Sequence, residues 1–346
     1  IGYLFVYKTN ILSADQKNYK IDKINTIYTL IRTCVQILII VLIKSYFVYI
    51  LSGVVFTLFI NLRISILADK EYPYIKSKEK LEKTVRKEIV NNLKSIFIYK
   101  ISATLMSSID NIVMSTLIGT VIVGIYSNYY IAISSVNAII SMLFGAVTAS
   151  IGNVVVTEEK KERHRIFKCM QLISFCISAI VGINYFLLID DFIKLWIGKQ
   201  YLLKEIDILA ISFDLYLGMM MRPLWTFRDA TGLYMKTRYI MAIAAFLNIL
   251  FSISLGKQFG VAGIIFASSL CRLLTYIWYE PIILYKEYFD ENVKSYFISI
   301  GINMLGTGIL LLMLSTINDY LEITSWIGWI GKGFLFSIVI ISVYYI

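Results

Sequence analysis

Ten long apolar stretches restrict the fold of this chain more than any other feature of its sequence. A membrane-spanning helix needs about 20 mostly apolar residues, and the 346 residues are 58% apolar and only 16% charged. After an apolar stub at 1–7, the candidate spans are 26–43, 46–68, 95–119, 121–155, 169–189, 208–227, 239–255, 261–285, 296–317 and 325–346. We therefore predict an all-α polytopic membrane helix bundle.

The loops between these stretches alternate between rich and poor in lysine and arginine. One alternate set, 8–25, 68–94, 157–168, 228–238 and 286–294, holds 22 basic residues, whereas the other holds 5. Basic loops stay on the cytoplasmic side of a membrane, so we predict that the first set faces the cytoplasm. The net charge of +10 is not gathered on one soluble domain, which argues against a nucleic-acid partner.

Six basic residues lie inside the apolar stretches: Arg32, Arg63, Lys100, Arg222, Arg272 and Lys332. Each costs roughly 2.5–3.5 kcal/mol at a bilayer centre when it faces lipid. We therefore expect most of them to face a polar cavity, which would attract an anionic ligand. Arg272 and Lys100 rank first as cavity residues, Arg222 and Arg32 next, and Arg63 and Lys332 last. The middle group and Arg63 can also snorkel to the cytoplasmic surface.

Two acidic residues, Asp110 and Asp214, also lie within predicted spans. An acid facing a membrane cavity can titrate or hold a cation, so both are candidates for coupling to protons or sodium. For Asp110, a position near the membrane surface is an equal alternative. Pro223 directly follows Arg222 and predicts a kink that aims this arginine into a cavity.

Signs of an enzyme are weak in this sequence. No phosphate-binding, dinucleotide-binding or zinc-binding motif occurs, so we predict no metal and no cofactor. Asp190 and Asp191 could form a catalytic pair, but a polar cap on a helix end is the better interpretation. The only histidine, His164, lies in a charged loop and is predicted to be a surface residue.

Several motifs are similar to those of one transporter group. They are S-x-D-N-I-V-M-S…G-x-x-x-x-G-I-Y-S-N-Y at 108–129, F-R-D-A-T-G-L-Y…R-Y at 227–239, N-I-L-F-S-I-S-L-G-K-Q-F-G-V-A-G-I at 248–264, L-S-A-D-Q-K-N-Y at 12–19 and K-E-Y-P at 70–73. The chain resembles Wzx-type oligosaccharide-lipid flippases of the multidrug/oligosaccharidyl-lipid/polysaccharide exporter superfamily. The similarity covers most of residues 10–290.

The resemblance implies two lobes of spans around a central cavity. Residues 1–68 would end the N-terminal lobe and 69–94 would be a cytoplasmic amphipathic inter-lobe linker. Residues 95–285 would form a C-terminal lobe of six spans, and 286–346 an extra span pair. Because the chain begins and ends within apolar stretches, we expect an N-terminally truncated fragment with about ten complete spans.

The implied function is a flippase in the bacterial cytoplasmic membrane, not an enzyme. It would move undecaprenyl-diphosphate-linked glycans for capsule, O-antigen or exopolysaccharide synthesis, with cavity cations meeting the diphosphate or acidic sugars. The implied partners are this lipid-linked glycan, membrane lipids, and a polysaccharide polymerase with chain-length proteins. Two alternatives stay open: a multidrug cation antiporter of the same superfamily, which needs an acidic cavity, and a polysaccharide polymerase, which usually has a large external loop.

Overall fold

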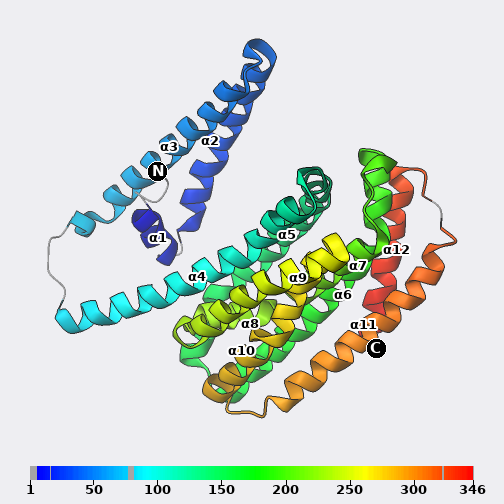
Figure 1. The fold of residues 1–346 in the computed structure, drawn as a ribbon. Coiled ribbons are helices and arrows are strands. Elements are labelled where there is room, and N and C mark those ends of the chain that lie inside the picture. Colours follow the sequence, from blue (N-terminus) through cyan, green and yellow to red (C-terminus); the bar gives the residue numbers. More distant parts are fainter. Residues whose placement is uncertain (1–5, 16, 77–81, 322, 346) are drawn as a thin grey trace. The chain divides into compact units, whose positions relative to one another are not determined.

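The computed structural model describes residues 6–15, 17–76, 82–321 and 323–345. These residues form helices and no strands (Figure 1), and eight of the helices are long and apolar enough to cross a membrane. The predicted all-α polytopic membrane fold is therefore confirmed. The chain divides into two compact units, Ile1–Lys83 and Thr84–Ile346.

The first unit contains three α-helices and two short helical turns. They are α1 (Val6–Ala14), α2 (Asn18–Leu38), the π-helical turn η2 (Ile39–Ile43), α3 (Tyr46–Glu71) and the 3-10 turn η3 (Pro73–Lys76). Lys44, at a φ of 54°, reverses the chain between α2 and α3. The two long helices pack against each other along the hairpin.

Polar contacts tie the open end of this hairpin to α1. Lys17 lies 2.7 Å from Asp15 and 3.2 Å from Glu71, and Lys8 lies 2.7 Å from Asp69. Beside these ion pairs, Leu12 of α1 is fully buried with Ala68 of α3. The first unit thus has its own small core at the end where its predicted basic loop lies.

The second unit contains the remaining helices. They are α4 (Lys83–Leu117), α5 (Thr120–Thr157), α6 (Lys160–Trp196), η4 (Lys199–Tyr201), α7 (Glu205–Met220), α8 (Arg222–Thr231), α9 (Tyr234–Leu274), α10 (Tyr276–Leu284), η5 (Tyr285–Phe289), α11 (Lys294–Asn318) and α12 (Trp326–Tyr345). α6 packs against α7 on one side and against α12 on another, and α5 packs against α8.

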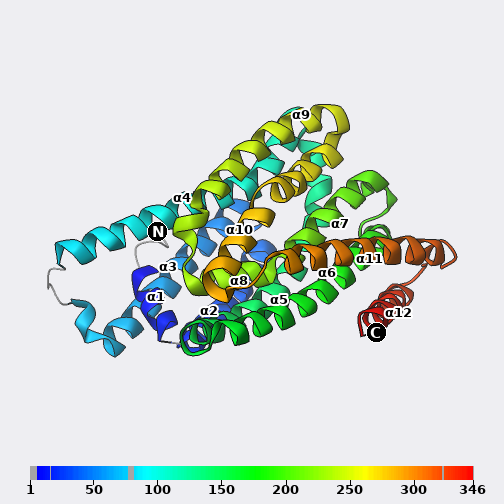
Figure 2. The same ribbon diagram turned by 90° about the horizontal axis from the view of Figure 1, so that it is seen from below.

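The ten predicted spans all correspond to helices or helix arms. α9 folds back on itself at Gly260 (Figure 2), where φ is 63° and ψ is −134°, and so supplies the span 239–255 and the first part of 261–285, which α10 and the start of η5 complete. α7 is too short to be counted among the eight long helices, and together with α8 it forms the predicted span 208–227. Residues 1–5 of the N-terminal stub and the last residue of the final span lie outside the described residues.

The kink predicted at Pro223 is confirmed. α7 ends at Met220 and α8 begins at Arg222; between them Met221 stays in the right-handed helical region, but its ψ of −5° departs from the usual helical value. Proline is tolerated in the first turn of a helix because its missing N–H has no partner there anyway. The break therefore places Arg222 at the start of a new, ten-residue helix.

Residues 83–94, at the end of the predicted linker, form the first turns of α4. The turn before α5 depends on Gly119, at a φ of 123°. One local expectation needs correction, namely that His164 is a surface residue. His164 is buried, with its ring against Tyr285, because α6 starts early enough to turn this histidine inward. The predicted division into lobes, linker and extra span pair stays a prediction.

Within the second unit, the basic loops gather at one end of the bundle. Lys160, at the start of α6, lies 3.3 Å from Asp290 in the loop before α11, and the rings of Tyr99 and Tyr234 meet at 5.2 Å. At the other end, the Ala262 amide donates to Asp207 at 2.8 Å. The alternation of loops read from the sequence therefore matches the helix directions in this unit, and the cytoplasmic assignment stays a prediction.

We predict that Gly260→Ala weakens the α9 hairpin. A side chain at this positive φ costs about 1–3 kcal/mol of unfolding free energy. The control is Gly301→Ala in α11, where an added Cβ meets no atom within 4 Å and alanine favours the helix. Unfolding in detergent should show a loss for the first variant only. Equal stability of both variants would contradict a strained turn at Gly260.

Candidate functional site

A polar cavity of about 390 Å³ lies among the helices of the second unit. Its walls come from α4, α5, α7, α8, both arms of α9 and the start of α10. The charged residues in its lining are Lys100, Asp110, Asp214, Arg222, Arg228 and Arg272. Five of the eight charged residues that the sequence offered as cavity or ion-coupling candidates therefore meet in one cavity. Their binding roles stay predictions.

Arg272 is held by an acid. Its Nη2 lies 3.2 Å from Oδ2 of Asp214, and its Nη1 donates to the main-chain oxygen of the same residue at 3.1 Å. Ser269 donates to the other carboxylate oxygen at 3.1 Å. The pair joins the second arm of α9 to α7. Arg272, the first-ranked cavity cation, is thus largely neutralised in this structure.

Gly218 makes room for this pair. A Cβ added at residue 218 would lie 3.1 Å from Nη1 of Arg272, which is tighter than an ordinary contact. Because Asp214, Gly218 and Arg222 follow each other at intervals of one helical turn, they share the cavity face as α7 passes into α8. Glycine lets the guanidinium of Arg272 approach that face.

Asp110 is bound differently from Asp214. Both of its carboxylate oxygens lie 3.1 Å from the Ser268 hydroxyl, which in turn accepts a hydrogen bond from Nδ2 of Asn248 at 2.8 Å. Within the described ranges, no basic side chain lies at ion-pair distance from Asp110. Asp110 lines the cavity, and its depth in the membrane stays a prediction.

Arg222 faces the cavity with neutral partners. Its Nη1 donates to the Ser141 hydroxyl at 3.0 Å, and its Nη2 donates to Oδ1 of Asn137 at 2.7 Å. Its Nε is buried without a partner among the described residues. The Trp225 ring lies 5.5 Å from the guanidinium carbon. An arginine placed this way keeps its full positive charge and a free N–H, which suits an anion.

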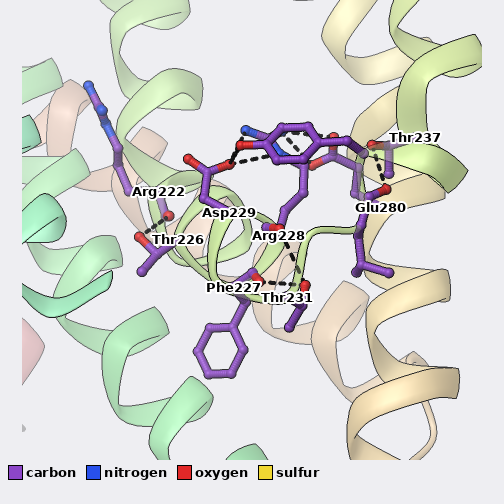
Figure 3. Close-up of polar contacts among 10 residues, drawn as sticks. Arg222, Thr226, Phe227, Arg228, Asp229, Thr231, Thr237 and Glu280 are labelled. Atoms are coloured by element: carbon purple, nitrogen blue, oxygen red, sulfur yellow. Dashed lines mark hydrogen bonds and ion pairs between the residues drawn. The ribbon is translucent and has the colours of Figure 1, made fainter. Parts of the chain in front are cut away.

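Arg228, at the other end of α8, is neutralised. Its Nη1 lies 3.1 Å from Glu280 of α10, and its Nη2 lies 3.2 Å from Asp229. The rings of Tyr99 and Tyr234 lie 4.6 Å and 5.7 Å from its guanidinium carbon. Figure 3 shows Arg228 between the two acids, with Arg222 directed away from them. Glu280 follows Arg272 by eight residues in the sequence, but its partner is Arg228.

Lys100 is the second cavity base without an acid. It is exposed on α4 and has no hydrogen bond or ion pair to any residue that the structure describes. Lys100 and Arg222 are therefore the two cavity bases that still carry uncompensated charge. The sequence ranked Arg272 above Arg222 as a cavity residue; both line the cavity, and only Arg272 has an acidic partner there among the described residues.

Several predicted residues lie elsewhere. Arg32 and Arg63 belong to α2 and α3 of the first unit, and their cavity role stays a prediction. Lys332 is not a lining residue, because its Nζ donates to the Leu321 carbonyl at 2.9 Å. Asp190 accepts from Tyr129 at 3.0 Å, whereas Asp191 pairs with Lys194 at 3.3 Å. The separate partners favour the polar-cap interpretation of these two acids.

Sequence reasoning missed the neutral polar residues around the charges. Asn137 with Ser141, and Ser268 with Arg272, are each four residues apart in an apolar helix. Such spacing puts both side chains on one helix face. A search for polar residues at this interval within spans would have found them, although it could not have told which helix they face.

The comparisons with known proteins give one match. Residues 2–204, more than half of the chain, match a family described as polysaccharide biosynthesis protein. No curated protein matches the chain, and no solved structure matches it.

We predict that Arg228→Gln lowers the unfolding free energy by roughly 3–5 kcal/mol, because it leaves the buried Glu280 carboxylate without its partner. The double variant Arg228→Gln, Glu280→Gln should lose less than this single variant. Denaturant unfolding in detergent measures both. The control is Arg165→Gln, which removes one side of an exposed pair with Glu162. Additive losses in the double variant would show that the pair is not coupled.

Proposed function

The chain belongs to the polysaccharide biosynthesis protein family, and from this premise we propose that it acts as a flippase. It moves undecaprenyl-diphosphate-linked oligosaccharide repeat units across the bacterial cytoplasmic membrane for capsule, O-antigen or exopolysaccharide synthesis. The units then pass to a polysaccharide polymerase and its chain-length proteins. The single observation that carries this proposal is the state of Arg222, a charged guanidinium with only neutral partners at a membrane cavity.

Arg222 and Lys100 bind the anionic part of the substrate. The planar guanidinium matches two oxygens of a phosphate or a carboxylate, and Lys100 adds a second positive charge from α4. Because the Asn137 and Ser141 contacts are neutral, an incoming anion displaces no acid from Arg222. An anionic substrate thus compensates positive charge for which the cavity provides no acidic partner.

The sugar units occupy the polar remainder of the cavity. Asn111, Ser107 and Tyr130 line it, and no hydrogen bond joins their side chains to a charged residue in the described part of the chain. The Trp225 ring, beside Arg222, offers an apolar face on which a pyranose ring can stack. The prenyl chain stays in the lipid, where its burial costs nothing.

Transport proceeds by alternating access between two lobes. The first unit supplies the last spans of the N-terminal lobe, and residues 69–94 form the linker to the C-terminal lobe. Arg32 and Arg63 add positive charge from the N-terminal lobe. The basic loops stay in the cytoplasm throughout the cycle.

The cavity charges separate this proposal from the multidrug cation antiporter. Four basic and two acidic residues line the cavity, and one acid is already held by Arg272. A cavity for cationic drugs needs free acids, and only Asp110 fits that description among the described residues.

We predict that Arg222→Gln lowers surface polysaccharide by about tenfold or more, since a charge-assisted contact of about 1.5–3 kcal/mol is lost. The variant is tested in the source bacterium in place of the native gene, with lipid-linked repeat units measured on each leaflet. Single repeat units should accumulate on the inner leaflet. Arg222→Lys keeps the charge but not the two-point geometry, so it should recover only part of the export.

The matched control is Lys257→Gln, which removes an exposed base outside the cavity. Normal polysaccharide in the Arg222→Gln strain would contradict the proposal. Repeat units displayed outside but not polymerised would favour a polymerase. Loss of drug resistance with intact polysaccharide would favour the antiporter.

A further inference from the structure

We propose that one face of α6 binds an anionic phospholipid of the membrane leaflet at the basic end of the bundle. Lys161, Arg165 and Lys168 bind the phosphate of the head group. Leu172, one turn further along the helix, contacts the acyl chains. These four residues are called the α6 stripe. None of them lines the cavity, so lipid binding at the stripe does not depend on the proposed flippase function.

The α6 stripe lies on the outer surface of the second unit. Its members are spaced by four, three and four residues, which keeps them on one helix face, and all four are exposed. On the inward face of α6, Phe167 is fully buried, with its ring 5.1 Å from that of Phe289 in η5. The side chains of the stripe therefore point away from the core of this unit.

The stripe changes from basic to apolar within one helical turn. Lys161 and Lys168 are seven residues apart, about 10 Å along the helix axis. The apolar span predicted at 169–189 begins directly after Lys168. A head-group layer is roughly 5–8 Å deep on each side of the hydrocarbon core. A phosphate held at the level of Lys168 therefore has its acyl chains at the level of Leu172.

Two neighbouring bases that lie off the stripe are engaged within the protein. Lys160 lies 3.3 Å from Asp290 in the loop before α11. The Nε of Arg163 donates to the main-chain oxygen of Glu158 at 2.8 Å. The second unit thus uses these two bases for contacts of its own.

The bases on the stripe are much less engaged. Lys161 and Lys168 have no hydrogen bond and no ion pair to any residue that the structure describes. Arg165 has one acidic neighbour, Glu162, at 3.6 Å, and 75% of the arginine side chain is exposed. Exposed pairs of this kind are weak and are screened by salt. Three positive charges are therefore available to one phosphate.

An anionic phospholipid supplies both the charge and the apolar contact that the stripe calls for. Anionic lipids attract lysine and arginine that lie close to the membrane surface. Leu172 is 65% exposed and its neighbour Ile173 is 58% exposed, so that apolar surface continues directly from the bases. A free phosphate ion would use the bases alone. An acidic protein would leave this apolar surface to the lipid.

The test compares two lipids with identical acyl chains on the purified chain in detergent. Thermal unfolding is followed while phosphatidylglycerol or phosphatidylcholine is added, and native mass spectrometry counts the lipids that stay bound. Phosphatidylglycerol should raise the melting temperature more than phosphatidylcholine does. About 0.5 M sodium chloride should reduce this difference, because salt screens charges at a surface.

The triple variant Lys161→Gln, Arg165→Gln, Lys168→Gln should bind phosphatidylglycerol about tenfold to a hundredfold more weakly than the wild type. It should also lose the preference for this lipid over phosphatidylcholine.

The matched control is the triple variant Lys199→Gln, Lys257→Gln, Lys286→Gln, which removes three exposed bases outside the stripe. It should keep the wild-type preference. Leu172→Asn should weaken the binding of both lipids alike, because it removes apolar contact and leaves the charges in place.

A stripe variant that keeps the wild-type preference overturns the inference, as does a wild type that responds to both lipids alike. An equal response to inorganic phosphate without lipid would assign the bases to a free anion and overturn it too. So would an acidic protein that copurifies only when the stripe is intact, in a chain without lipid preference. Circular dichroism checks that the variants are folded.

Discussion

The ion pair between Arg272 and Asp214 is the contact on which the cavity depends. It crosses from the second arm of α9 to α7 and compensates an arginine that lipid could not accept. Gly218 clears the space for it, and Ser269 orients the acid. With this arginine paired inside the second unit, Arg222, Lys100 and Asp110 are the cavity charges without an oppositely charged partner among the described residues.

This arrangement places two charges of opposite sign in one cavity, and neither has an oppositely charged partner among the described residues. Arg222 lies among neutral groups of α5, whereas Asp110 lies among neutral groups of α9. The proposed anion site at Arg222 therefore shares its cavity with an unpaired carboxylate.

The hydropathy pattern, the basic loops and the helix-breaking proline predicted the main helices of the fold and where they end. The ten apolar stretches, the alternation of basic loops and the break at Pro223 are each set by short stretches of chain, and so each could be predicted. The pairing of charges was not predictable. Arg272 lies near Glu280 in sequence yet pairs with Asp214, because the choice depends on which helix faces it across the bundle. His164 was misplaced for the same reason, since its burial depends on Tyr285.

The hairpin of α9 has a consequence for how the protein enters the membrane. Asp214 precedes Arg272 by 58 residues, so α7 leaves the ribosome well before the arm that carries the arginine. Each charged segment is energetically unfavourable alone in lipid. The ion pair between Asp214 and Arg272 lowers this cost for both. The helices from α7 to the second arm of α9 should therefore stay together at the insertion machinery and enter the bilayer together, after the ion pair has formed.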